Sequence, residues 1–194
     1  MRIVAGKHRG RVLQAPEGLE VRPTADRVRE ALFNILEHKG FRADGLSPVR
    51  DAIVLDAFAG TGALGLEALS RGAAHVTFME TDRRAVAAIR ANVAALREEA
   101  RTSLREADAT RPPPAPPAGR TAPCTLVFLD PPYGRGLGAP ALAALAARGW
   151  IAADAICVIE LEAKEPFAPP EGFTQLDERR YGKARLVFLT RTPD

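Results

Sequence analysis

Short apolar runs alternate with amphipathic stretches along most of the chain. Five runs of β-like character lie at residues 52–56, 75–80, 103–108, 124–130 and 156–162. The stretches at 62–72, 82–100 and 139–149 carry apolar residues at helical spacing. Continuous apolar strands that alternate with amphipathic helices predict an α/β fold, with a mostly parallel sheet, helices on both faces and right-handed crossovers.

The two ends of the chain have different patterns. Residues 2–6 and 11–15 are short apolar segments separated by KHRG, which predicts a small N-terminal β-hairpin, and residues 25–38 predict a helix. Two strand-like runs at 173–181 and 184–191 predict a C-terminal antiparallel hairpin. We therefore expect an N-terminal extension over residues 1–40 and a main domain over residues 50–194. The proline-rich residues 111–119 predict a solvated loop.

Composition limits the class of protein. The chain has 194 residues, of which 46% are hydrophobic, which suits a folded globular protein. No apolar run approaches the roughly 18 residues of a membrane span, and the N-terminus lacks a signal-peptide pattern, so we expect a cytoplasmic protein. Cys124 and Cys157 lie in apolar runs, which predicts buried free thiols, and the scattered histidines predict no metal site.

Positive charge is concentrated at the N-terminus. The net charge is only +3, but the first eleven residues contain four basic side chains and no acid: Arg2, Lys7, Arg9 and Arg11. Charge of one sign at a chain end indicates a polyanionic partner.

A glycine-rich segment follows the first apolar run. Gly60, Gly62 and Gly65 satisfy G-x-G-x-x-G at the start of a predicted helix, a pattern also found in dinucleotide-binding folds. Asp56, just ahead of it, would repel a pyrophosphate but attract a cationic amino group. The segment therefore favours a nucleoside that carries an amino acid.

Acidic residues end four of the predicted strands. Asp56, Glu80, Asp108 and Asp130 each close an apolar run. Ligands of open parallel sheets bind beyond the carboxyl ends of the strands, so these side chains are expected to share one site. Glu80 is at the spacing for an acid that binds ribose hydroxyls. Asp108 could accept a hydrogen bond from an adenine amino group.

The sequence LDAFAGTG, Glu80, Asp108 and Asp130-Pro-Pro-Tyr133, in this order, resembles the S-adenosylmethionine-dependent methyltransferases that modify exocyclic amino groups. More narrowly, the chain resembles the bacterial family that methylates a guanine N2 of 16S ribosomal RNA, from MRIVAGKHRGR through RPTADRVRE to the final hairpin. The resemblance implies a Rossmann-like class I methyltransferase fold with seven strands and S-adenosylmethionine as cofactor. It also implies ribosomal RNA as partner, within the small subunit or its precursor particle.

The resemblance and the strand-end pattern together assign candidate residues. Asp130 and the Pro131 carbonyl would accept hydrogen bonds from the target amine, and Tyr133 would stack on the base. The expected cofactor contacts are Asp56, Phe58, Gly60, Gly62, Glu80, Thr81, Asp108, Ala109 and Thr24. The expected substrate contacts are Lys7, Arg9, Arg11, Arg22, Arg27, Arg29 and Pro132.

Other functions fit parts of the sequence. An amino methyltransferase that acts on DNA adenine N6 or on a protein glutamine could use the same D-P-P-Y segment. An NAD-dependent oxidoreductase would account for the glycine pattern but is opposed by Asp56. A non-catalytic RNA-binding assembly factor would account for the basic N-terminus.

Overall fold

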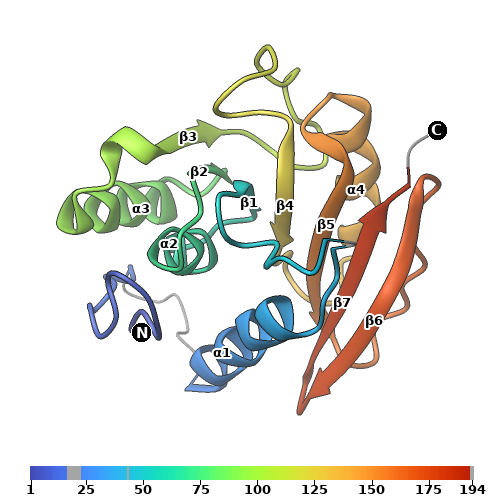
Figure 1. Cartoon of the computed structure of the whole chain (residues 1–194), viewed down its shortest axis with the longest axis horizontal. Helices are drawn as coiled ribbons and strands as arrows, with labels where there is room; N and C mark the ends of the chain where they lie inside the picture. The colour runs from blue at the N-terminus through green and yellow to red at the C-terminus, as the bar shows by residue number, and fades with distance from the viewer. Residues whose placement is uncertain (17–22, 43, 193–194) are drawn as a thin grey trace.

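A single seven-stranded sheet organises the molecule. The computed structural model describes residues 1–16, 23–42 and 44–192, without the side chains of 23–25. The strand order is β3-β2-β1-β4-β5-β7-β6 (Figure 1). The bounds are β1 Ile53–Ala57, β2 His75–Glu80, β3 Thr102–Glu106, β4 Cys124–Leu129, β5 Ile151–Glu162, β6 Phe173–Tyr181 and β7 Ala184–Arg191. Strands β1 to β5 pair in parallel, and β7 and β6 pair antiparallel, as the sequence predicts.

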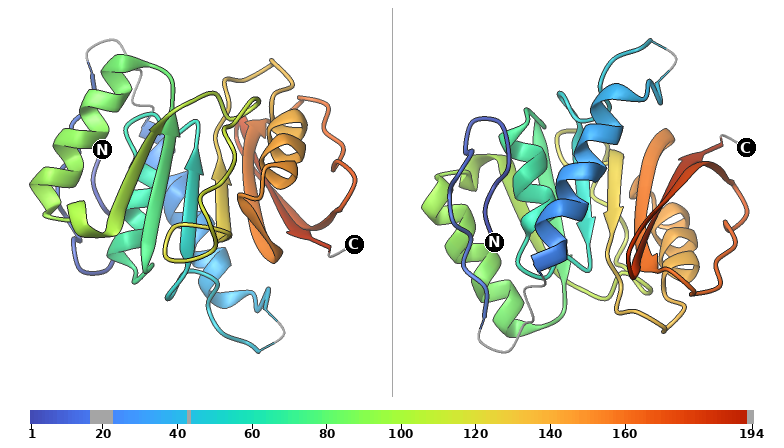
Figure 2. Two further views of the ribbon diagram at one scale, coloured as in Figure 1. Left: turned by 90° about the horizontal axis from the view of Figure 1, so that it is seen from above. Right: turned by 90° about the horizontal axis from the view of Figure 1, so that it is seen from below.

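Helices cover both faces of the sheet, which confirms the expected layering (Figure 2). Alternate strand residues point to opposite faces. Val54 and Phe78 pack in one hydrophobic cluster with α1, α2 and α3, whereas Leu55 and Met79 pack in a second cluster with α4. The helices are α1 Pro23–His38, α2 Ala63–Ser70, α3 Arg83–Leu96 and α4 Gly138–Ala147, with a short 3-10 helix, η1, at Glu99–Arg101.

The N-terminal segment reverses direction as expected, but its pairing is limited to one bridge between Arg2 and Val12. Three backbone hydrogen bonds also join its two arms, from the N–H groups of Ile3, Gly10 and Leu13 to the carbonyls of Arg11, Ile3 and Met1 at 3.0, 2.8 and 3.1 Å, and further donors bond to α2. The amides of Val4 and Ala5 donate to the two carboxylate oxygens of Glu67 at 2.8 and 3.0 Å. Glu67 is fully buried, so these two hydrogen bonds anchor the segment on the main domain.

Two further side chains anchor the same segment. The amide of Asn92 accepts from the Gln14 N–H at 2.7 Å and donates to the Gln14 carbonyl at 3.0 Å. The nearly buried carboxylate of Glu98 accepts from Lys7 Nζ at 3.0 Å and contacts His8 Nε2 at 2.6 Å. The N-terminal segment therefore has a fixed position beside α2 and α3.

The proline-rich segment is less solvated than its composition predicts. Pro112 is buried, and the indole N–H of buried Trp150 donates to the Pro113 carbonyl at 2.8 Å. A buried indole requires such an acceptor.

Cys124 and Cys157 are buried free thiols, as predicted, and burial raises the pKa of Cys124 to about 12. Within the part of the chain that the structure describes, no helix is both long and apolar enough to cross a membrane.

Candidate active site

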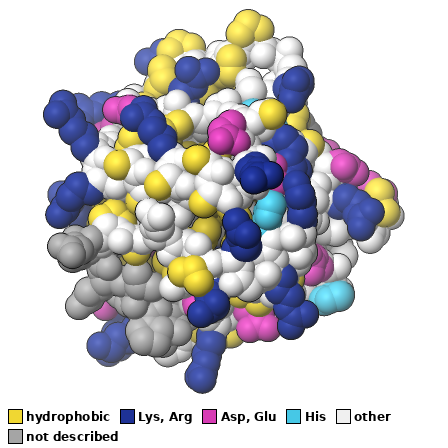
Figure 3. Space-filling model, turned by 90° about the vertical axis from the view of Figure 1, so that its left-hand side faces the viewer, with side chains coloured by type: hydrophobic (Ala, Val, Ile, Leu, Met, Phe, Trp, Pro, Cys, Tyr) yellow, Lys and Arg dark blue, Asp and Glu magenta, His cyan; other side chains and the backbone are white. Residues whose placement is uncertain are grey.

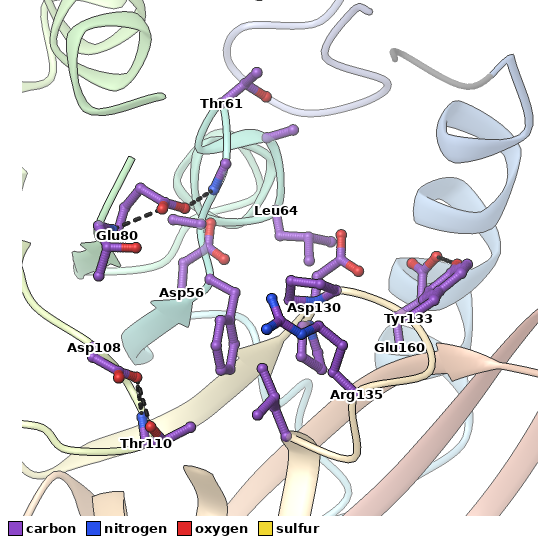
Figure 4. A pocket seen from close by; sticks show the side chains of 18 of the residues that line it. Asp56, Thr61, Leu64, Glu80, Asp108, Thr110, Asp130, Tyr133, Arg135 and Glu160 are labelled. Carbon is purple, nitrogen blue, oxygen red and sulfur yellow. Dashed lines mark hydrogen bonds between the residues drawn. The ribbon is translucent and has the colours of Figure 1, made fainter. Parts of the chain in front are cut away.

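A cavity of about 770 Å³ lies at the carboxyl ends of the parallel strands (Figure 4). All four predicted acids line it, and Glu160 of β5 lines it as well. The strand order places these acids in a row along the sheet edge: Asp108, Glu80, Asp56, Asp130 and Glu160. The expected convergence of the strand-end carboxylates is therefore present in the structure.

Asp56 is the most deeply buried of these acids, with 1% of its surface exposed. Its Oδ2 accepts from the Gly65 N–H at 2.8 Å, whereas no hydrogen-bond partner faces Oδ1 within the described residues. Burial raises the pKa of Asp56 to about 8, and the nearby charge of Glu80 adds to this effect. A ligand ammonium at Oδ1 would supply both the missing partner and the opposite charge.

Gly62 and Gly65 of the predicted loop are required for different structural reasons. Gly62 has a φ of 77°, precedes α2 and does not line the cavity, although it was expected to contact a cofactor. A Cβ at Gly65 would lie 2.5 Å from the Phe78 ring and 3.1 Å from Asp56 Oδ2. Because Gly65 has no side chain, α2 can approach β2 closely and the Gly65 N–H can reach Asp56 Oδ2.

Glu80 is held by backbone donors at the end of β2. Its Oε2 accepts from the Gly60 N–H at 2.8 Å, and its Oε1 accepts from the N–H groups of Thr81 and Asp82 at 2.7 and 2.9 Å. Gly60 and Thr81 also line the cavity. A carboxylate has about four lone-pair sites, so Glu80 can still accept a hydrogen bond from a ligand hydroxyl while the backbone donors hold it in place.

Asp108 follows β3 and is also oriented locally. Its Oδ1 accepts from the backbone N–H and the hydroxyl of Thr110 at 2.8 and 2.7 Å. These hydrogen bonds lower the pKa of Asp108. Ala109, an expected cofactor contact, is buried and outside the cavity lining.

Phe58 presents an aromatic side chain to the cavity from a constrained backbone. Its φ is 57°, a conformation that is rare for a bulky residue. Such conformations cluster at ligand sites. We therefore keep Phe58 as a candidate contact for a flat ring.

The Asp130-Pro131-Pro132-Tyr133 segment forms the wall of the cavity beside β4 and β5. Asp130 is exposed at this wall. The Tyr133 hydroxyl donates to Glu160 Oε1 at 2.5 Å, so the phenol is oriented by a neighbouring strand (Figure 4). Two successive prolines restrict the backbone between Asp130 and Tyr133.

The loop after Tyr133 is fixed by Glu165. The carboxylate of Glu165 accepts from the N–H groups of Gly134 and Gly136 at 2.8 and 3.1 Å. Arg135, between these two glycines, lines the cavity. The loop therefore presents a cation at the same opening as Asp130.

The predicted basic contacts fall into separate groups. Lys7, Arg9, Arg11 and Arg27 are exposed. Arg29, an expected substrate contact, borders the cavity but is only 4% exposed, and it donates to the Arg2 carbonyl and to Asp26. Arg22 and the Thr24 side chain lie outside the described residues.

Several residues of the lining were not predicted from the sequence, among them Thr61, Thr110, Arg135 and Glu160. Of these, only Glu160 could have been noticed in the sequence, because it is an acid inside the apolar run at 156–162. In the sheet it follows Ile159, the register partner of Leu129. Within the described residues, no group of three or more His, Cys, Asp or Glu side chains is arranged to hold a metal ion.

Comparison with known proteins identifies relatives over nearly the whole chain. Residues 1–190 match the family described as conserved hypothetical protein 95. The chain is 41% identical over 166 residues to ribosomal RNA small subunit methyltransferase D of Escherichia coli K12, a match that covers 84% of this chain and 76% of that protein. The protein of the same name from Haemophilus influenzae is 35% identical over 186 residues, covering 94% and 89%. The solved structure of yhhF from Escherichia coli is similar with a TM-score of 0.80 at 35% identity, over 99% and 98% of the two chains.

Proposed function

Since the chain belongs to the ribosomal RNA small subunit methyltransferase D family, we propose that it transfers a methyl group from S-adenosylmethionine to the N2 amino group of a guanine in 16S ribosomal RNA. The substrate would be the small subunit or its precursor particle, in the cytoplasm. The main support for this proposal is that a single cavity is lined both by buried Asp56 and by the Asp130 to Tyr133 segment.

The row of acids suits the parts of this cofactor. Asp56 Oδ1 would accept from the ammonium of the amino-acid end, and Glu80 would accept from the ribose hydroxyls. Asp108 would accept from the adenine amino group, and Phe58 would contact the adenine ring. S-Adenosylmethionine, when bound, supplies an electrophilic methyl group on a sulfonium centre.

Asp130 and Pro131 would activate the target amine. The lone pair of a guanine N2 amino group is delocalised into the base, which makes the nitrogen a poor nucleophile. Acceptors at Asp130 and at the Pro131 carbonyl would hold the two N–H bonds and favour a tetrahedral nitrogen. As the N–C bond forms, the bond from the methyl carbon to the sulfonium sulfur would break and leave a neutral thioether, and N2 would lose one proton to Asp130 or to solvent water.

Tyr133 and Pro132 would receive the base after it leaves its stack. A base placed on the Tyr133 ring gains about 1–3 kcal/mol from stacking, which offsets part of the cost of flipping. The hydrogen bond to Glu160 keeps the ring in one orientation before the RNA arrives.

Residues 1–40 would act as an RNA-binding extension. Figure 3 shows Lys and Arg side chains over the side of the molecule on which the N-terminal segment lies. Lys7, Arg9, Arg11 and Arg27 are exposed and would contact phosphates, which positions RNA without reading its sequence.

Replacing Lys7, Arg9 and Arg11 together with alanine is expected to raise the KM for RNA about tenfold or more. The slope of log affinity against log salt should fall by about 0.7–0.9 for each phosphate that the protein no longer neutralises. Filter binding at several salt concentrations measures this slope. A triple alanine variant at exposed Arg148, Lys164 and Lys183 is the charge-matched control. An unchanged salt slope in the N-terminal variant would remove these residues from the RNA-binding surface.

Transfer of a tritiated methyl group tests the proposed function. The purified protein is incubated with labelled S-adenosylmethionine and with 16S ribosomal RNA, small subunits, 23S ribosomal RNA or duplex DNA. Label is expected in 16S ribosomal RNA, free or assembled, and calorimetry should show binding of S-adenosylmethionine but not of NAD. Preferential labelling of DNA or of 23S ribosomal RNA, or binding of NAD alone, would contradict the proposal.

A further inference from the structure

Glu160 and Asp130 both follow the last paired position of β4 and β5. Leu129, the last residue of β4, pairs with Ile159 of β5, and the next residue along each segment is an acid: Asp130 after β4 and Glu160 within β5. Ile159 and Leu161 pack in the cluster on the α4 side, which sends Glu160 to the opposite side of β5. Both acids line the same cavity.

Tyr133 fixes the position of the Glu160 carboxylate. Its hydroxyl donates to Oε1 at 2.5 Å, so the carboxylate lies at the edge of the phenol ring. Figure 4 shows Tyr133 and Glu160 together, with Asp130 between them and Asp56. A base stacked on the Tyr133 ring is parallel to it, and its edge would therefore border the carboxylate.

The edge of guanine fits two neighbouring carboxylates. Guanine presents two adjacent donors, N1–H and the N2 amino group, whereas adenine presents an unprotonated N1 acceptor beside its amino group. An ionised carboxylate and the unprotonated N1 of adenine are both acceptors, so no hydrogen bond forms between them and their lone pairs repel each other. The pair of acids therefore selects a base whose ring nitrogen carries a proton.

We propose that Glu160 is a specificity-determining residue that accepts the N1–H of the target guanine while Asp130 accepts from N2. This inference rests on the proposed function, because it assigns the base-reading contact of the same reaction. Tyr133 then has two tasks, since its ring stacks on the base and its hydroxyl orients the acid that reads it.

The test uses RNA in which the mapped target guanine is replaced by 2-aminopurine. This base keeps the 2-amino group but has an unprotonated N1 and no O6. Wild-type protein is expected to prefer guanine over 2-aminopurine by about tenfold or more in kcat/KM, the range for loss of one hydrogen bond to a charged group. Equal use of both bases by the wild-type protein would overturn the proposal.

Glu160→Gln should reverse part of this preference. With its oxygen on the Tyr133 hydroxyl, the amide would place its NH₂ toward N1, where it repels the N1–H of guanine and donates to 2-aminopurine. The ratio of kcat/KM for guanine to that for 2-aminopurine should fall about tenfold or more. A merely structural role would lower both rates and leave the ratio unchanged.

Two controls separate the possible failures. Glu162→Gln changes an exposed acid of the same strand outside the cavity lining, and its ratio should equal that of the wild type. Calorimetry with S-adenosylmethionine shows whether each variant is folded. If the wild type methylates guanine and folded Glu160→Gln keeps the wild-type ratio, the role of Glu160 is wrong. If the wild type methylates no guanine, the proposed function itself is wrong.

Discussion

Asp130→Ala is expected to lower the rate of methyl transfer by about 10²–10³-fold or more while S-adenosylmethionine still binds. The side chain would hold the target amine in the geometry of attack, and loss of such a positioned acceptor raises the barrier of the chemical step. Single-turnover rates with saturating RNA measure transfer, and calorimetry measures cofactor affinity separately.

Two variants calibrate this result. Asp130→Asn keeps an acceptor oxygen without the charge and should fall between the wild type and Asp130→Ala. Asp154→Ala removes an exposed acid near the start of β5, outside the cavity lining, and should leave the rate unchanged. If Asp130→Ala kept more than about a tenth of the wild-type rate, the side chain would not hold the amine.

Asp56→Asn is expected to weaken S-adenosylmethionine binding about 10–100-fold, because it removes a charge-assisted hydrogen bond to the ammonium. The same change should stabilise the cofactor-free protein above neutral pH. Asp56 is fully buried with one oxygen unpartnered among the described residues, so its ionised form is disfavoured in the folded state.

The pH dependence follows from the raised pKa of Asp56, about 8 in the folded protein. In the unfolded chain the pKa of an Asp is about 3.9, so between these values the folded state binds more protons. The contribution of Asp56 to the free energy of unfolding is fully present below the pKa of the unfolded chain. It is lost as the pH rises through the pKa of the folded protein, about 8. Denaturant titrations from pH 4 to 9 should show this decline in the wild type and a weaker one in Asp56→Asn. Equal pH profiles and equal cofactor affinity would remove Asp56 from the binding site.

The sheet and most of the acidic row could be predicted because both depend on local pattern. Apolar strands such as 124–129 and the acids that end them are visible in the sequence, and the edge rule for parallel sheets then places Asp56, Glu80, Asp108 and Asp130 together.

Features that depend on distant partners could not be predicted. The position of the N-terminal segment depends on buried Glu67, over sixty residues away, which accepts hydrogen bonds from the N–H groups of Val4 and Ala5. Trp150 bonds to the carbonyl of Pro113, which composition alone assigns to a solvated loop. The link between Tyr133 and Glu160 joins two segments whose contact depends on the register of β4 and β5.

Nucleoside analysis of the reaction product shows which base and which atom the protein methylates. Unmodified 16S ribosomal RNA or small subunits are incubated with the protein and S-adenosylmethionine, the RNA is digested to nucleosides, and the products are identified by mass spectrometry. We expect N2-methylguanosine with the wild-type protein and its near absence with Asp130→Ala. N6-Methyladenosine as the product, or a modified protein glutamine with unmodified RNA, would contradict it.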